Sequence, residues 1–240
     1  MSLTDHKILT FDVVGTLIDF ETGILDYFAP IFADLGREMD CQAVLAAYGR
    51  AEDAEHHRTP GIPFPPMLAP IYSAIADTFD LPDTPELREG LRLSIPDWPA
   101  FPDSVAALKR LGQHYTLVAM TNSDDWALDH FDATLDHPFD VLVTAEKAEA
   151  CKPDPQVFGF VRGLMFDKGF RRSDYLHVAQ SQYHDIGVSK ALGYTTCWIE
   201  RRADQDGFGA SPDPAEVTVP DYHFTSLAAL ADAVEARVPA

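Results

Sequence analysis

Residues 7–19 read KILTFDVVGTLID, and this stretch decides the fold. Residues 7–11 form a short apolar and β-branched run that stops at Asp12 and Gly15, a pattern that predicts a buried strand followed by a tight turn. Similar runs, separated by segments with helical character, follow at 115–120, 139–144, 175–179 and 195–199. Strands that alternate with helices predict an α/β fold with a doubly wound, Rossmann-like parallel sheet.

The first two predicted strands are separated by about a hundred residues, far more than one crossover helix needs. Helix-compatible apolar spacing occurs there at 24–35, 41–57, 67–79 and 85–93. The prolines between 60 and 66 predict a loop, residues 96–102 a return hinge, and Asp103 a helix cap. We therefore expect a core of residues 1–19 and 97–240 and an inserted helical cap of residues 20–96.

The composition limits the classes of partner. A formal charge of −20, from 38 acidic and 18 basic residues, disfavours nucleic acid and anionic membranes as partners. The first twelve residues do not resemble a secretory signal, and no stretch reaches membrane-spanning length, so we expect a cytoplasmic protein. The three cysteines are widely spaced, which argues against a disulfide framework and a zinc site. A homodimer is compatible with the sequence.

Polar residues follow each predicted strand. In open α/β sheets ligands bind outside the carboxyl ends of the strands, which here are followed by Asp12, by Thr121 and Asn122, by the segment leading to Lys152, and by residues 180–185. A carboxylate in a partly desolvated site needs a nearby cation to stay ionised. This argument pairs Asp12 with Lys152.

Together these residues resemble the motifs of the haloacid dehalogenase superfamily. The run from Asp12 to Asp19 is similar to its D-x-x-G-T-L-x-D motif, and Thr121-Asn122, Lys152-Pro153 and Asp185 follow in the family's order. The resemblance implies a hydrolase with a nucleophilic Asp12 and a charge-neutralising Lys152. Asp19 is interpreted as structural, and His184 as a packing or surface residue.

The chain lacks two groups that the superfamily's phosphatases carry, a general acid and a magnesium ligand. Those phosphatases carry a second Asp as general acid where this chain has Val14, which cannot exchange a proton. They also carry an acidic magnesium ligand where this chain reads Ala179-Gln180-Ser181. We therefore expect no metal and no cofactor. The chain is more similar to the L-2-haloacid dehalogenase (type II) branch, which needs neither group.

Within that branch, Arg50 matches an arginine that faces the leaving group, whereas Phe158 stands where a tyrosine is usual. A closer likeness is to the L-azetidine-2-carboxylate hydrolase offshoot, through phrases such as Trp98 to Asp103 and Tyr183-His184-Asp185. That enzyme type opens a strained ring by hydrolysis, with a protonated ring nitrogen in place of the halide.

The resulting hypothesis is a metal-independent hydrolase that acts at the α-carbon of a small 2-substituted carboxylate, foremost an (S)-2-haloacid, through an aspartyl ester. Ring opening of azetidine-2-carboxylate, an atypical phosphatase and a non-catalytic ligand-binding relative are the alternatives. The expected catalytic residues are Asp12, Thr16, Lys152 and Asp185. The expected substrate-binding residues are Val13, Val14, Phe20, Arg50, Thr121, Asn122, Trp126 and Ser181.

Overall fold

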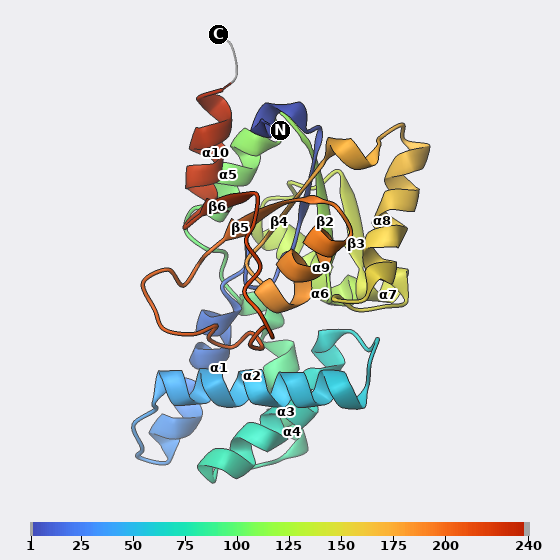
Figure 1. Ribbon diagram of the computed structural model, residues 1–240. Coiled ribbons are helices and arrows are strands. Elements are labelled where there is room, and N and C mark those ends of the chain that lie inside the picture. The colour runs from blue at the N-terminus through green and yellow to red at the C-terminus, as the bar shows by residue number, and fades with distance from the viewer. Residues whose placement is uncertain (1, 238–240) are drawn as a thin grey trace.

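A computed structural model describes residues 2–237, and a six-stranded parallel sheet lies at its centre (Figure 1). The strand order is β3-β2-β1-β4-β5-β6. Strand β1 pairs with β2 on one side and with β4 on the other, so Asp12 follows a central strand. The strands are β1 (Ile8–Phe11), β2 (Thr116–Thr121), β3 (Val141–Thr144), β4 (Tyr175–Ala179), β5 (Thr195–Ile199) and β6 (Tyr222–Phe224). The predicted α/β fold is confirmed, although the short edge strand β6 was not predicted.

Helices cover both faces of the sheet, so its central strand β1 is buried on both sides. Leu9 and Phe11 pack in one apolar cluster with α5 and α10, whereas Ile8 packs in a second cluster with α8. Burial of a side chain such as Phe11 contributes about 1.5–3 kcal/mol. The core helices are α5 (Ser104–Leu111), α6 (Asp125–Thr134), α7 (Ala145–Ala148), α8 (Pro155–Asp167), α9 (Gly187–Ala191) and α10 (Leu227–Glu235).

Four further helices lie below the carboxyl ends of the strands, within the segment predicted as the cap (Figure 1). The first begins at Phe20, before the predicted residue 24, because the Asp19 carboxylate accepts hydrogen bonds from the Thr22 amide and hydroxyl, at 3.1 and 2.7 Å. Asp19 therefore has the structural role expected of it. The cap helices are α1 (Phe20–Asp34), α2 (Cys41–Arg58), α3 (Phe64–Phe79) and α4 (Pro85–Leu93).

Two local predictions about helix starts were wrong in whole or in part. Pro65 and Pro66 do not lie in a loop but in the first turn of α3. Amide hydrogens in the first turn have no partner within the helix, so proline costs no hydrogen bond there. Asp103 does occupy the N-cap position of α5, but its side chain makes no capping hydrogen bond. Its carboxylate instead binds the Arg201 guanidinium and the Ala228 amide at the start of α10, which fastens the carboxyl-terminal helix to the sheet.

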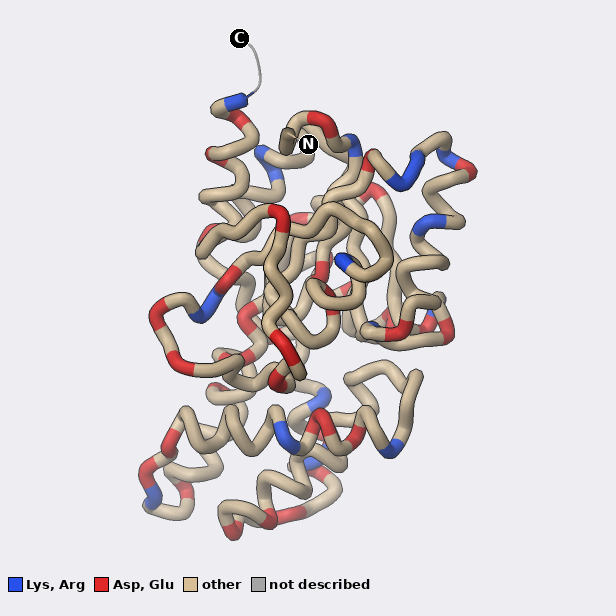
Figure 2. Tube along the Cα trace, viewed as in Figure 1, with Lys and Arg blue, Asp and Glu red and all other residues tan. Residues whose placement is uncertain are grey.

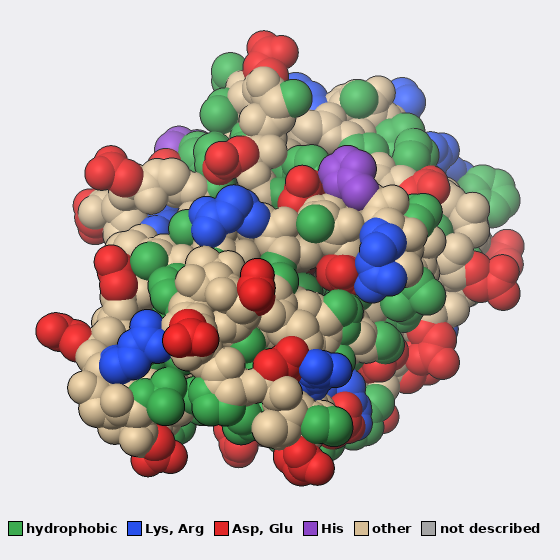
Figure 3. All heavy atoms as spheres, turned by 90° about the horizontal axis from the view of Figure 1, so that it is seen from below, with side chains coloured by type: hydrophobic (Ala, Val, Ile, Leu, Met, Phe, Trp, Pro, Cys, Tyr) green, Lys and Arg blue, Asp and Glu red, His purple; other side chains and the backbone are tan. Residues whose placement is uncertain are grey.

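Acidic residues are spread over both the core and the cap, as Figure 2 shows. Basic and acidic side chains are interspersed on the lower face of the cap in Figure 3, where no broad basic surface is visible. No helix among residues 2–237 has the length and apolar character needed to cross a membrane.

Trp98 joins the cap to the core. It is 1% exposed and stacks on Phe64 of α3 and on Phe131 of α6, with ring centroids 6.0 and 6.1 Å apart. Gly23 of α1 lies against the same indole, since a Cβ atom at this position would be only 2.3 Å from Trp98 Cδ1. The contact between α1 and Trp98 therefore requires glycine.

We predict that Gly23→Ala destabilises the protein by about 1–3 kcal/mol, although alanine favours helix, because the indole has to move out of a filled site. Gly159→Ala in α8 is the matched control, since a Cβ atom there meets no atom within 4 Å. It should be neutral or stabilising by up to about 1 kcal/mol. Urea unfolding of both variants measures the difference, and equal midpoints would disprove the steric argument.

Candidate active site

The turn after β1 places the carboxylate of Asp12 at the end of the sheet. The Asp12 amide donates to Val178 O of β4 at 3.1 Å, and Gly15 adopts a φ of +86° that favours glycine. Thr16 Oγ1 then donates to Asp12 Oδ2 at 2.6 Å and accepts from the Gln180 amide at 2.8 Å. Thr16 thus connects the carboxylate to the loop that follows β4.

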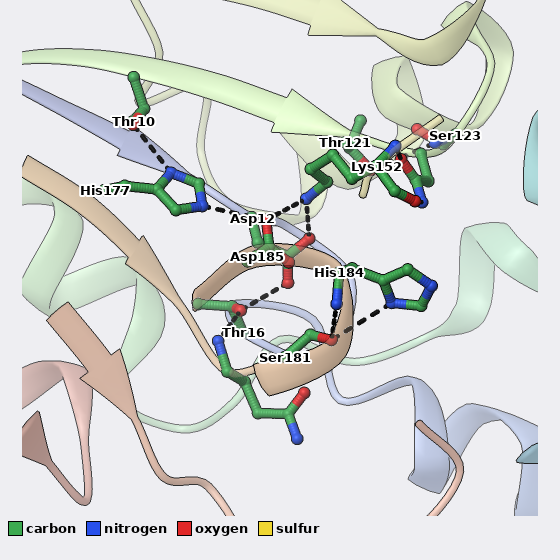
Figure 4. A network of polar contacts seen from close by, with 12 residues as sticks. Thr10, Asp12, Thr16, Thr121, Ser123, Lys152, His177, Ser181, His184 and Asp185 are labelled. Atoms are coloured by element: carbon green, nitrogen blue, oxygen red, sulfur yellow. Dashed lines mark hydrogen bonds and ion pairs between the residues drawn. The ribbon is translucent and has the colours of Figure 1, made fainter. Parts of the chain in front are cut away.

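Lys152 lies between two buried carboxylates (Figure 4). Its Nζ atom is 2.8 Å from Asp12 Oδ1 and 2.8 Å from Asp185 Oδ1. Lys152 is 1% exposed, Asp12 6% and Asp185 0%. One ammonium group therefore partly compensates the charge of two carboxylates that are largely shielded from water.

The backbone of Lys152 is held by the side chain of Asn122. Asn122 Oδ1 accepts from the Lys152 amide at 2.6 Å, and Nδ2 donates to the Lys152 carbonyl at 2.9 Å. The Asn122 carbonyl also accepts from the amide of Phe64, the first residue of α3, at 3.0 Å. Asn122 was predicted to hold substrate, but most of its hydrogen-bonding capacity is used to position Lys152.

His177 was not identified from the sequence, yet it orients Asp185 from within β4. Its Nε2 lies 3.0 Å from Asp185 Oδ1, and its Nδ1 lies 2.9 Å from Thr10 Oγ1. Since an ionised carboxylate only accepts, Nε2 carries the proton, and Nδ1 can then accept from Thr10. The second oxygen of Asp185, Oδ2, is buried and has no partner among residues 2–237.

The two carboxylates differ in their electrostatics. Burial raises the pKa of Asp12 against the opposing charge of Lys152. Burial would also raise the pKa of Asp185, but Lys152 and the hydrogen bond from His177 outweigh this effect and lower the pKa to about 2. Burial alone would lower the pKa of Lys152, yet the two carboxylates raise it. Asp185 therefore holds its charge firmly, and Asp12 is the more basic carboxylate.

A small cavity of about 40 Å³ opens onto this network. Most predicted site residues line it: Asp12, Val14, Phe20, Thr121, Asn122, Lys152, Ser181 and Asp185. Thr16 contacts the cavity only through its bond to Asp12. The volume admits only a few small groups unless the cap moves, which favours a small ligand.

Three predicted substrate-binding residues do not line this cavity. Arg50 is exposed and lines a separate hollow beside the loop at 206–213. Successive helical residues are rotated by about 100°, so Arg50 points away from the side of α2 that carries Tyr48 and Glu52. Trp126 makes a cation–π contact with Arg92, whose guanidinium carbon lies 4.6 Å from the ring centroid. Val13 is fully buried in the core.

Five residues that line the cavity were not predicted: Tyr48, Glu52, Phe64, His184 and Ser211. Tyr48 and Glu52 are four positions apart on α2, a spacing that places both on one side of the helix. His184, which was interpreted as a packing or surface residue, is half-buried and lines the cavity, where its Nδ1 lies 3.2 Å from Ser181 Oγ. The helical spacing was visible in the sequence, whereas the side of α2 that faces the sheet was not.

The donor set does not fit the magnesium ion of the superfamily's phosphatases. The position between the two carboxylates is occupied by Lys152 Nζ, Val14 supplies no ligand, and Gln180 Oε1 lies 3.3 Å from the Ser211 hydroxyl. No group of three or more His, Cys, Asp or Glu side chains within residues 2–237 could hold a metal ion. The carboxylate ligands that a magnesium ion would need beside Asp12 are therefore missing at positions 14 and 180.

Lys152→Met should destabilise the protein by about 3–5 kcal/mol at neutral pH, because it leaves two buried carboxylates unpaired. In the variant both carboxyl pKa values lie above their unfolded values, so the loss should shrink as the pH falls through them. Urea unfolding at pH 7 and pH 4.5 tests this.

Lys147→Met removes an exposed lysine that pairs with Asp125 at 3.3 Å and should change stability little. Adding Asp12→Asn to Lys152→Met should restore part of the loss. A loss in Lys152→Met that does not depend on pH would contradict the charge argument.

Known proteins are similar to this chain in sequence and in fold. The chain is 28% identical over 137 residues to an (S)-2-haloacid dehalogenase from Pseudomonas sp. (strain YL), covering 56% of this chain and 53% of that protein. The chain thus spans about half the length of the curated relatives it matches. A defluorinating L-2-haloacid dehalogenase has the same fold, with a TM-score of 0.80, 18% identity and 98% of each chain covered.

The L-2-haloacid dehalogenase from Xanthobacter autotrophicus, solved with chloropropionic acid covalently bound, also has this fold. Its TM-score is 0.70 at 15% identity, with 97% of this chain and 100% of that chain covered. The sequence model of the haloacid dehalogenase-like hydrolase family matches residues 6–179, a segment that contains Asp12, Lys152 and His177. The chain therefore belongs to the haloacid dehalogenase-like hydrolase family.

Proposed function

We propose that the protein is a metal-independent hydrolase that acts at the α-carbon of a small 2-substituted carboxylate through an ester on Asp12. The observation that carries the proposal is the buried Asp12 carboxylate, held by Lys152 and Thr16 in a cavity where Val14 replaces a general acid. A reaction at carbon with a leaving group that needs no proton from the protein suits this site.

In the first step an oxygen of Asp12 attacks C2 of the substrate, and the leaving group departs with the bonding electron pair. Lys152 and Thr16 fix the direction of the carboxylate. Thr121, Ser181 and the remaining amide hydrogen of Asn122 line the same cavity and can bind the substrate carboxylate. Attack from the side opposite the leaving group inverts the configuration at C2.

In the second step water cleaves the ester. Asp185 lines the cavity and its Oδ2 has no hydrogen-bond partner among residues 2–237, so this carboxylate can accept a proton from that water. The water attacks the carboxyl carbon of Asp12, so the bond to C2 stays intact and a 2-hydroxy acid is released. His177 and Lys152 keep Asp185 in place for this role.

The relatives favour a halide as the leaving group, so we infer (S)-2-haloacid dehalogenation as the first form of the reaction to test. A halide departs without protonation and makes no demand on Val14. A phosphatase is less compatible with the site, since its leaving oxygen needs an acid where this chain has Val14, and its magnesium ion needs a carboxylate where this chain has Gln180.

A single turnover in heavy-oxygen water should place the label in the Asp12 carboxylate, because the water oxygen enters Asp12 and not the product. Incubation with both enantiomers of 2-chloropropionate in the presence of a chelator, followed by mass spectrometry of the peptide that contains Asp12, measures this. Asp12→Asn should be inactive. Label in the product alone, or phenyl phosphate cleavage only with magnesium, would contradict the proposal.

The pH dependence should reflect the raised pKa of Asp12, because only the ionised carboxylate attacks. The acidic limb of kcat/KM should therefore lie above the ordinary aspartate value of 3.8, with activity lost as the pH falls through it. Asp185 contributes no limb near neutrality, since its pKa is lowered to about 2. An acidic limb at or below pH 3.8 would show that burial of Asp12 does not control the nucleophile.

A further inference from the structure

A surface hollow, the α8 hollow, lies between α8 and the start of β4 and has a volume of about 510 Å³. Tyr175 begins β4 and pairs with Ile8, the first residue of β1, whereas Asp12 follows the last residue of β1. A strand rises about 3.3 Å per residue, so the length of β1 places Tyr175 about 13 Å from the level of Asp12 along the sheet. The α8 hollow is therefore separate from the candidate active site.

The charged side chains that line the α8 hollow are all basic: Arg162 of α8, and Arg171 and Arg172, which precede β4. Among residues 2–237, no carboxylate oxygen lies within 4.0 Å of these three guanidinium groups. Elsewhere, Arg110 and Arg201 each pair with a carboxylate at 2.6 and 2.8 Å. Figure 2 shows basic residues on α8 and on the loop that follows it. In a chain with 38 acidic and 18 basic residues, this hollow is a local reversal of charge that attracts anions.

Tyr175 adds a buried polar group to the same hollow. It is 1% exposed, and its hydroxyl forms no hydrogen bond within the described residues 2–237. Burial raises the pKa of Tyr175, and the nearby charge of Arg162 opposes this rise. A buried tyrosine hydroxyl usually has a hydrogen-bond partner. An anion held by Arg162 would supply the acceptor that this hydroxyl lacks.

The side of the hollow formed by α8 can accept a flat ring. Phe166 is 59% exposed, and the guanidinium carbon of Arg171 lies 4.4 Å from its ring centroid. Gly159 and Gly163 are one helical turn apart and also line the hollow. A Cβ atom at either glycine would meet no atom within 4 Å, so the helix surface is open there. A planar group can lie on this surface and contact the exposed ring of Phe166.

We propose that the α8 hollow binds a small phosphorylated molecule that carries an aromatic ring, of the nucleoside diphosphate class. The phosphate groups bind to the three arginines and the Tyr175 hydroxyl, and the ring lies on α8 beside Phe166. Guanidinium groups donate two parallel hydrogen bonds to phosphate oxygens, and a diphosphate has enough oxygens to engage all three. The site acts by binding alone and does not depend on the reaction at Asp12.

ADP, pyrophosphate and adenosine separate the contributions of charge and ring. Calorimetry in the presence of a chelator should show one ADP bound per chain, pyrophosphate bound about ten-fold more weakly, and no measurable binding of adenosine. Arg162→Gln should weaken ADP binding about ten-fold, because charge-assisted hydrogen bonds are lost. Arg88→Gln is the matched control, since it removes an arginine of the cap that pairs with Asp83, and it should bind ADP as the wild-type protein does.

Two further variants locate the ligand. Gly163→Leu fills the open surface of α8 and should weaken ADP more than pyrophosphate. Asp12→Asn should leave ADP binding unchanged, and a loss in this variant would place ADP in the candidate active site and overturn the inference. Absence of ADP binding, equal affinities for ADP and pyrophosphate, or an ADP affinity that neither Arg162→Gln nor Gly163→Leu changes would also reject it.

Discussion

The ammonium group of Lys152 is shared by Asp12 and Asp185, and the arrangement of the strand ends depends on this contact. Taking each charge out of water costs several kcal/mol, which only close opposite charges and hydrogen bonds can offset. Residues that follow β1 and β2 and one residue within β4 contribute to meeting that cost. The Asn122 amide fixes the Lys152 backbone, while Thr16 and His177 supply further donors to the carboxylates.

The sharing is unequal, and this inequality separates two chemical roles. Asp185 receives Lys152 and His177 on one oxygen and keeps its charge over the whole working pH range. Asp12 is less strongly stabilised and retains more basicity, as the proposed role of nucleophile requires. Two carboxylates with one cation between them can thus act at different steps without a metal ion.

The sequence was informative where local pattern determines structure. The run before Asp12 predicted a buried strand, and the polar residues after each strand were expected at the carboxyl ends of a parallel sheet. Features set by tertiary packing were not predictable. Arg50 was predicted to bind substrate from its place in a short sequence match. The orientation of α2 instead places Glu52 in the cavity with Asp12 and Arg50 in a separate hollow. His177 was hidden within an apolar strand.

The hydrogen bond from the Phe64 amide to the Asn122 carbonyl ties the two parts of the molecule together at a sensitive place. Phe64 begins a cap helix, and Asn122 is the residue whose amide grips the backbone of Lys152. If the first turn of α3 lifts away from the sheet, it pulls on the group that fixes the cation. Ligand access by that route would therefore also disturb the charge compensation at Asp12.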